Sequence, residues 1–100
     1  MRVIAKSTLV TFYQAHPETK VSLERWHALV KGGSWTSPVE VQQTFANAVV
    51  LNGERIKFEV VGGNYRLICA FNFRLQIAYV KFLGTHKEYD RIDALTVSQF

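Results

Sequence analysis

The period of the hydrophobic pattern changes once along this chain, near residue 48. Before that point apolar residues recur three and four positions apart, as Leu23, Trp26 and Val30 do, which is the spacing of one helix face. After it, apolar and charged residues alternate through residues 56–60, as in a strand with one buried face. Helices followed by strands predict an α+β domain, with two N-terminal helices packed on a mostly antiparallel sheet of about four strands.

Turn and capping residues give the expected limits of these elements. Ser7 is a plausible N-cap for the first helix, Pro17 fits the first position of the second, and Ser37 with Glu40 matches a capping box. Glycines end the second helix and separate the strands. The expected helices cover residues 7–15, 17–31 and 38–45, and the expected strands cover residues 2–5, 49–51, 55–61, 65–73 and 76–83.

Composition limits the chain to one domain. One hundred residues, 48% of them hydrophobic, suffice for one packed core, so we assign residues 1–100 to a single domain. No apolar run is long enough to span a membrane, and the N-terminus has no continuous signal-peptide core. The lone Cys69 excludes an internal disulfide. We therefore expect a cytoplasmic protein without membrane contact.

Positive charge is concentrated in the second half of the chain. Residues 1–54 contain five Lys and Arg against four Asp and Glu, whereas residues 55–91 contain seven against three. The cations of the second segment are interleaved with aromatic residues, a combination that suits RNA because cations bind phosphates and aromatic rings stack on bases. The structural alternative is a solvated sheet with a buried aromatic face.

Motifs for cofactors are absent from the sequence. The pairs Gly32-Gly33 and Gly62-Gly63 extend to neither a dinucleotide fingerprint nor a P-loop. His16, His27 and His86 are too far apart to form a local metal motif. We expect neither a cofactor nor a metal.

The segment 85–90 has an unusual density of polar side chains. His86, Lys87 and Tyr89 can all donate or exchange protons, and they follow Gly84 at the end of a strand. If the backbone stays extended, Lys87 and Tyr89 share one face and His86 lies on the other. The structural alternative is a charged, solvated strand end.

Metal-independent RNA cleavage by the 2′-hydroxyl needs a base, an acid and cations near the phosphate. An imidazole exchanges protons near neutral pH, so His86 suits either proton-transfer role, while Tyr89 can donate a proton or stack on a base. Arg66, within an otherwise apolar strand, can present a guanidinium to the phosphate. Its structural alternative is a salt bridge to Glu59 or Asp90.

Several motifs together resemble the HigB family of toxins over nearly the whole chain. The most specific are the turn Gly62-Gly63-Asn64 leading into Tyr-Arg-Leu-Ile at 65–68, and Thr-His-Lys-Glu-Tyr-Asp at 85–90. Members of the family often carry an extra residue, commonly lysine, after the Asn. Here Asn64 abuts Tyr65 directly, so the turn is tighter and one cation is absent.

The resemblance implies a RelE/ParE-like fold and a type II toxin, an endoribonuclease (mRNA interferase) that cuts translated mRNA on the ribosome. Its implied partners are mRNA, the ribosome with its 16S rRNA, and a HigA-type helix-turn-helix antitoxin, with DNA contacted only through the antitoxin complex. The catalytic residues it indicates are Arg66, His86, Lys87 and Tyr89. Binding to ribosomal RNA would account for the additional positive charge at Arg55, Lys57, Arg74, Lys81 and Arg91. Two alternatives remain open, a non-catalytic inhibitor with this fold and an RNA-binding module without toxicity.

Overall fold

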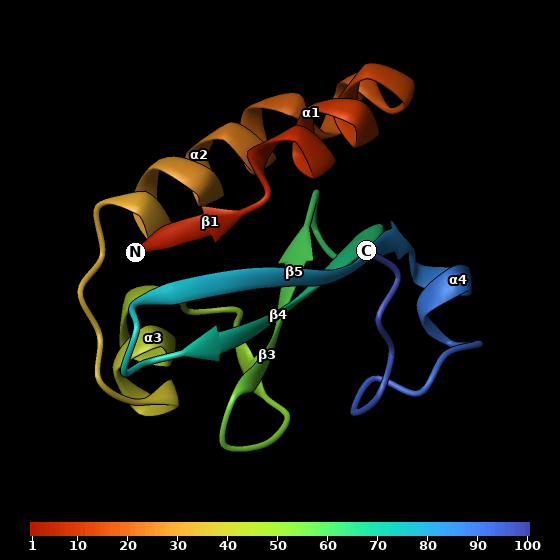
Figure 1. The fold of residues 1–100 in the computed structure, drawn as a ribbon. Coiled ribbons are helices and arrows are strands. Elements are labelled where there is room, and N and C mark those ends of the chain that lie inside the picture. Colours follow the sequence, from red (N-terminus) through yellow and green to blue (C-terminus); the bar gives the residue numbers. More distant parts are fainter.

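The five strands of the sheet run in the order β1-β5-β4-β3-β2 in the computed structural model, which describes residues 1–100 (Figure 1). β1 pairs with β5 in parallel and every other pair is antiparallel. The predicted α+β architecture is confirmed. The sheet has five strands instead of about four, because the short segments at both edges, residues 2–4 and 49–50, pair with it. The strands are β1 Arg2–Ile4, β2 Val49–Val50, β3 Arg55–Val60, β4 Tyr65–Asn72 and β5 Ile77–Thr85.

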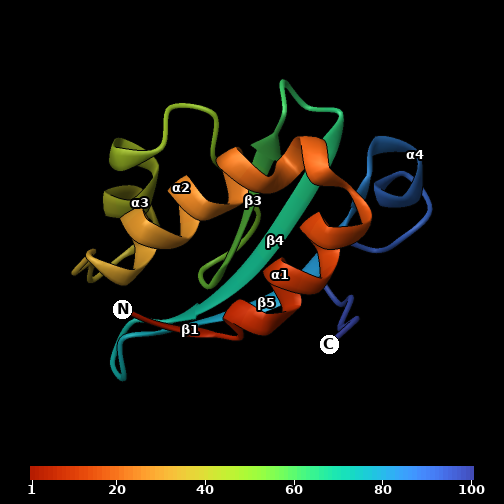
Figure 2. The same ribbon diagram turned by 90° about the horizontal axis from the view of Figure 1, so that it is seen from above.

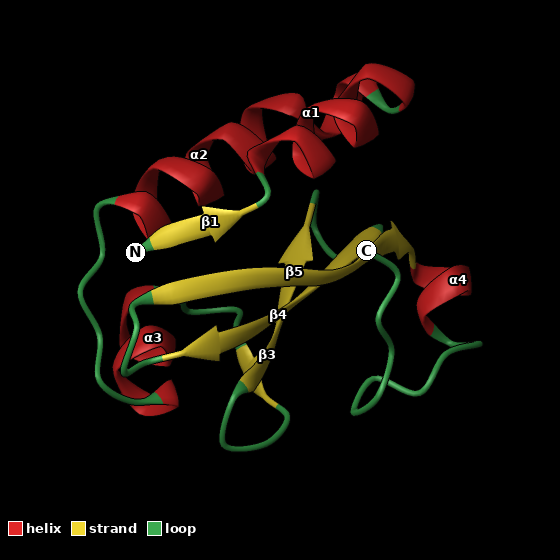
Figure 3. Ribbon diagram, viewed as in Figure 1, coloured by secondary structure: helices red, strands yellow, loops and turns green.

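Two helices lie side by side over one face of this sheet, as the view from above shows (Figure 2). They are α1 and α2, joined by a short 3₁₀ turn, and the remaining helical pieces α3 and α4 lie at the ends of the sheet (Figure 3). No helix is long and apolar enough to cross a membrane. The helical segments are α1 Lys6–Ala15, η1 Pro17–Thr19, α2 Lys20–Lys31, α3 Pro38–Thr44 and α4 His86–Tyr89.

The predicted starts of the three N-terminal helices are correct in one case. α3 begins after Ser37, whose hydroxyl accepts a hydrogen bond from the Glu40 N–H at 3.4 Å. Ser7 is not an N-cap, because α1 already begins at Lys6 and its N-cap has no side-chain bond. Pro17 starts the 3₁₀ turn rather than α2, which begins only at Lys20.

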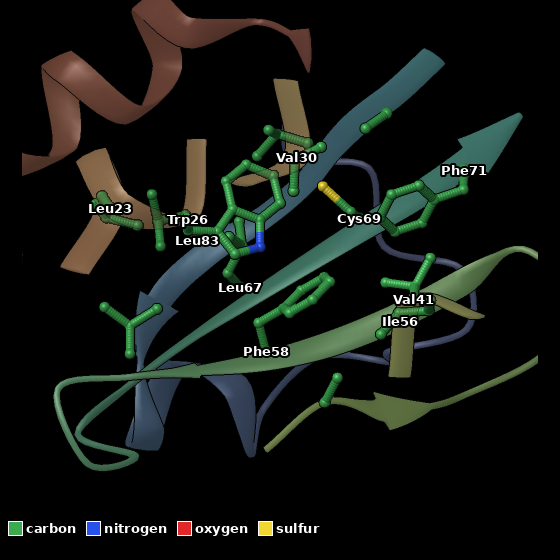
Figure 4. Packing of buried hydrophobic residues seen from close by; sticks show 14 of the residues in the cluster. Leu23, Trp26, Val30, Val41, Ile56, Phe58, Leu67, Cys69, Phe71 and Leu83 are labelled. Carbon is green, nitrogen blue, oxygen red and sulfur yellow. The ribbon is translucent and has the colours of Figure 1, made fainter. Parts of the chain in front are cut away.

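The main core lies between the helices and the sheet (Figure 4). Leu23, Trp26 and Val30, the periodic residues of α2, are all buried there. The alternate apolar residues of β3 and β4 face them across the layer, which is the pattern that one buried sheet face requires. Residues contributed by the three central strands include Ile56, Phe58, Val60, Leu67, Cys69, Phe71, Val80 and Leu83.

A bulge in β5 changes which side chains face the helices. Ile68 pairs with Phe82 but Cys69 pairs with Val80, so Lys81 is an extra residue in β5. A bulge shifts the alternation of side chains by one position. Phe82 consequently lies on the face opposite the helices, where it is buried.

The C-terminal segment covers part of that opposite face. Arg55 is 8% exposed, and its guanidinium donates to the carbonyl oxygens of Ala94 at 3.1 Å and Val97 at 2.7 Å. Gln99 extends the contact, since its N–H donates to the Lys81 carbonyl at 2.8 Å. The segment therefore lies along β5 beside α4, and Figure 1 shows the C-terminus at that end of the sheet.

Candidate functional site

The ring of Tyr89 lies beside two cations that come from neighbouring strands. The Lys57 ammonium is 5.6 Å from the ring centre, and the central guanidinium carbon of Arg66 is 5.4 Å from it. Both distances are in the range of cation–π attraction. All three side chains are half-buried, so they are held in place while remaining open to a ligand. We call Lys57, Arg66 and Tyr89 the cation–tyrosine cluster.

Strand register explains why Lys57 and Arg66 meet. Lys57 is opposite Ile68 in the β3–β4 ladder, and Arg66 is two residues before Ile68 on β4. Residues two apart on a strand share a face, so the two cations are diagonal neighbours on the face opposite the helices. The antiparallel pairing of β3 with β4 thus brings the positive charges of Lys57 and Arg66 together on one face of the sheet.

Arg66 forms neither of the salt bridges that its structural alternative required. Glu59 lies opposite it in the ladder, yet no ion pair forms, and Asp90 pairs instead with His86. The Nε of Arg66 donates to the Gly63 carbonyl at 3.2 Å, where Gly63 has a φ of 90°, a conformation that favours glycine. The turn therefore orients the guanidinium without neutralising it, which leaves its charge for an anionic ligand.

A capping box fixes the helical turn that carries Tyr89. The Glu88 N–H donates to the Thr85 hydroxyl at 3.1 Å, and the Thr85 N–H donates to the Glu88 carboxylate at 2.9 Å. These bonds to Thr85 lower the pKa of Glu88 below its ordinary value. Phe82 meets the Tyr89 ring edge-on at 6.1 Å between ring centres. Tyr89 is thus positioned by a cap on one side and an aromatic contact on the other.

Gly84 lets this turn approach the sheet. It pairs with Arg66 in the β4–β5 ladder. A Cβ at Gly84 would lie 2.8 Å from a Phe82 ring atom and 3.3 Å from the Glu88 carboxylate. Any larger residue would therefore displace the Phe82 ring and crowd the Glu88 side chain of the capping box. The prediction that Gly84 closes the strand is wrong, because β5 continues to Thr85.

His86 and Lys87 are placed differently from the sequence prediction. Residues 86–89 form a helical turn, so the alternating faces of an extended segment do not apply. The imidazole Nε2 of His86 lies 3.5 Å from a carboxylate oxygen of Asp90, one turn further on, and both side chains are exposed. Lys87 is also exposed. Of the four predicted catalytic residues, the fold brings Arg66 and Tyr89 into contact.

The five predicted RNA-binding residues are scattered by the fold. Lys57 joins the cation–tyrosine cluster, and Lys81 is the bulge residue, with its ammonium 5.5 Å from the centre of the Tyr79 ring. Arg91 is exposed just beyond α4. Arg74 lies in the turn after β4, at the far end of the sheet from Arg66. Arg66 and Arg74 are eight residues apart, so at about 3.3 Å per strand residue their Cα atoms are separated by roughly 25 Å.

Arg55 is the predicted RNA contact that the structure contradicts. Its guanidinium is buried and donates to two backbone carbonyls of the C-terminal segment, so it has a structural role. Sequence reasoning missed this role because the acceptors lie about forty positions away in the chain, and backbone carbonyls leave no signature in a sequence. Two backbone carbonyls already occupy Nη1 of this guanidinium, so little of the side chain is left for a phosphate.

No group of three or more His, Cys, Asp or Glu side chains is arranged to hold a metal ion. Cys69 is fully buried in β4, and burial raises the pKa of its thiol. A thiol that is buried and kept protonated is a poor nucleophile. The chemistry available at the site is therefore that of cations, an aromatic hydroxyl and the nearby imidazole.

Comparison with known proteins identifies the family of this chain. The model of the HigB toxin family, described as the RelE-like toxic component of a toxin-antitoxin system, matches residues 19–92. The chain belongs to the HigB toxin family. The matched region includes all three residues of the cation–tyrosine cluster. The resemblance found in the sequence motifs is confirmed, and so is the RelE-like fold.

One relative carries a named activity. It is an mRNA interferase HigB from Escherichia coli O6:H1 strain CFT073, 24% identical to this chain over 94 residues. The alignment covers 92% of this chain and 91% of that protein. The two HigB-family proteins are thus alike along nearly their whole length.

Proposed function

We propose that this HigB-family toxin is an endoribonuclease that cleaves mRNA while it is translated on the ribosome. The observation that carries the proposal is the cation–tyrosine cluster, in which two unneutralised cations flank the ring of Tyr89 on an accessible sheet face. Likeness to a protein named mRNA interferase supports the choice of substrate. Cations suit a phosphodiester, and an aromatic ring suits an unpaired base.

The proposed reaction needs no group beyond the side chains and the RNA. The 2′-hydroxyl oxygen attacks the adjacent phosphorus, the bond from phosphorus to the 5′-oxygen breaks, and a 2′,3′-cyclic phosphate and a 5′-hydroxyl end result. One proton leaves the 2′-oxygen and one reaches the departing 5′-oxygen. Arg66 and Lys57 stabilise the charge on the phosphoryl oxygens.

Tyr89 is the proton-transferring group that we assign to the cluster. It is the residue that the fold holds against both cations, whereas His86 faces Asp90 on the exposed side of α4. We assign the other proton transfer to His86, because an imidazole exchanges protons near neutral pH. Lys87, exposed on the same helical turn, is retained as an additional positive charge for the RNA.

The remaining exposed cations are proposed contacts with nucleic acid. Lys81 lies at the middle of β5 and Arg91 lies just beyond α4, and we assign both to mRNA. Arg74 lies in the turn after β4, at the far end of the sheet from Arg66, and is assigned to 16S rRNA, which can span both ends of a small domain. Electrostatic contacts of this kind weaken as salt rises.

We also propose that a HigA-type helix-turn-helix antitoxin neutralises the toxin and that the pair acts in the cytoplasm. Family membership supports an antitoxin partner, since the family is the toxic half of a toxin-antitoxin system. DNA is then contacted only through the antitoxin.

Mapping of new 5′ ends tests the proposed function. The chain is induced alone beside a translated reporter mRNA and beside the same message without its start codon. Cuts inside the reading frame that disappear without translation support the ribosome-dependent nuclease. Cuts in both messages indicate a free ribonuclease, and growth arrest without cuts indicates a non-catalytic inhibitor. Harmless expression without antitoxin indicates an RNA-binding module.

A further inference from the structure

A groove of about 400 Å³ lies on the side of β3 away from β4. Its walls come from α2, from the segment that follows α3 and from β3 itself. Figure 2 shows the chain after α3 passing beside α2 on its way to β3. The lining residues include Arg25, Trp26, Leu29, Phe45, Ala48 and Phe58. Six of its eleven lining residues are hydrophobic, and none belongs to the cation–tyrosine cluster.

The floor of this groove is an incomplete sheet edge. β2 pairs with β3 only at Val49 with Lys57 and at Val50 with Ile56. The Leu51 N–H donates to the Arg55 carbonyl at 2.8 Å, which shows that residues 55 and 57 direct their peptide groups toward β2. By the alternation of an antiparallel ladder, Glu59 directs its peptide groups to the same side. No strand pairs with Glu59 there, because the chain opposite it is already in the turn before β2.

We propose that this groove binds an extended segment of the antitoxin, which adds to the edge of β3 beyond β2. Unpaired peptide groups on a strand edge are satisfied by another backbone, so they select an extended peptide. Trp26, Leu29 and Phe45 provide a surface for alternate apolar side chains of that peptide. The rim holds Arg25 and Glu59, which have opposite charges and therefore do not favour nucleic acid.

The unpaired edge of β3 lies close to the cation–tyrosine cluster, so an antitoxin bound there can affect access to the cluster. Glu59 lies directly opposite Arg66 in the β3–β4 ladder. An antitoxin segment beside Glu59 is therefore one strand away from the cation–tyrosine cluster, close enough for its flanking residues to cover it. The inference deepens the proposed function, on which it rests for the identity of the partner.

Two pairs of variants test the edge and the groove separately. Glu59→Pro removes the outward N–H, which proline tolerates at an edge, while Glu59→Ala removes only the side chain. Leu29→Asp places a charge in the groove, while Val21→Asp alters an exposed apolar residue of α2 that does not line the groove. Binding of each full chain to its full-length cognate antitoxin is measured by titration, after unfolding curves show that the variants are folded.

We expect Glu59→Pro and Leu29→Asp to weaken antitoxin binding at least 10-fold, and the two controls to stay within about 2-fold of the wild type. Hydrogen exchange on the wild-type chain gives a second measurement, with the Glu59 amide fast in the free toxin and protected in the complex. Unchanged binding by both test variants, or an unprotected Glu59 amide, overturns the proposal. A free toxin that is dimeric through this edge also overturns it, because a second copy is then the occupant. Neither assay uses RNA, so failure of the nuclease proposal remains a separate result.

Discussion

Arg66 of β4 and Tyr89 of α4 meet with 5.4 Å between the guanidinium carbon and the ring centre, and neither side chain is in an ion pair. The contact joins a sheet strand to a helical turn that the capping box of Thr85 and Glu88 holds in place. A charged group that is oriented but not neutralised is what stabilisation of a phosphoryl transition state requires. The predictions below follow from this contact and its supports.

Replacement of Arg66 tests the charge at the site. Arg66→Ala is expected to lower the rate of mRNA cleavage about 100-fold or more, because a preorganised donor to the developing charge is lost. Arg66→Lys keeps the charge without the planar fork and should retain intermediate activity. Cleavage rates at saturating ribosome-bound mRNA measure this, with Arg2→Ala as a matched control, because Arg2 is exposed and pairs with Ile77 at the far end of the sheet. Equal losses for Arg66→Ala and Arg2→Ala would contradict the assignment.

Replacement of Tyr89 separates proton transfer from ring contacts. Tyr89→Phe keeps the ring beside Lys57 and Arg66 but removes the hydroxyl, so we expect the maximal rate to fall about 100-fold with little change in RNA affinity. Tyr89→Ala should lose both rate and affinity. The pH profile of single-turnover cleavage and a separate binding titration report the two effects. Full activity of Tyr89→Phe would remove the hydroxyl from the mechanism.

Loss of the capping box should change the position of the Tyr89 side chain although Tyr89 itself is not substituted. Thr85→Ala removes one cap bond and is expected to lower the free energy of unfolding by about 1 kcal/mol. Glu88→Ala should lower cleavage, whereas Glu88→Gln should restore most of it, because an amide oxygen still accepts from the Thr85 N–H. Unfolding curves and cleavage rates measured on the same samples check this. Equal activity of the alanine and glutamine variants would show that α4 needs no cap.

Arg55 should prove structural rather than RNA-binding. Arg55→Ala removes two charge-assisted hydrogen bonds to the Ala94 and Val97 carbonyls, so the free energy of unfolding should fall by about 2 kcal/mol or more. Hydrogen exchange should accelerate in residues 94–99. The salt dependence of RNA binding should not change, whereas Lys81→Ala should reduce its slope. A reduced slope for Arg55→Ala with normal stability would restore Arg55 as an RNA contact.

Acid should destabilise the fold through three hydrogen-bonded carboxylates. The hydroxyl of Tyr65 lowers the pKa of Glu18, and the backbone N–H groups of Thr36 and Thr85 lower the pKa values of Glu40 and Glu88. A carboxylate whose folded pKa is lowered contributes stability that is complete above its unfolded value and is lost as pH falls through its folded value. Thermal unfolding measured between pH 6 and pH 3 should show the midpoint falling below about pH 4.5. Combining Glu18→Gln, Glu40→Gln and Glu88→Gln should flatten that fall.

Local sequence signals predicted the elements of the fold well. The spacing of Leu23, Trp26 and Val30 placed α2, and the alternation through 56–60 placed β3, because both patterns follow from burial of one face. The error at Ser7 arose because α1 starts without any side-chain cap. The bulge at Lys81 had no local signal, since it depends on the register between β4 and β5.

The site was only partly accessible from the sequence. Arg66 and Tyr89 were predicted together, but the helical turn at 86–89 was missed although Thr85 and Glu88 have the spacing of a capping box. Lys57 was predicted as an RNA contact, and its place beside Tyr89 follows only from the β3–β4 register. Long-range contacts such as that of Arg55 with the C-terminal segment leave no local pattern to find.

The most direct test of the account is single-turnover cleavage of one defined mRNA, bound in programmed ribosomes and free in solution. The account predicts that the wild-type chain cuts the ribosome-bound mRNA and leaves a 2′,3′-cyclic phosphate and a 5′-hydroxyl. It also predicts that Arg66→Ala and Tyr89→Phe cut at least about 100-fold more slowly while still binding the ribosome. Wild-type cleavage that is unaffected by both substitutions would contradict the assignment of the cation–tyrosine cluster as the active site.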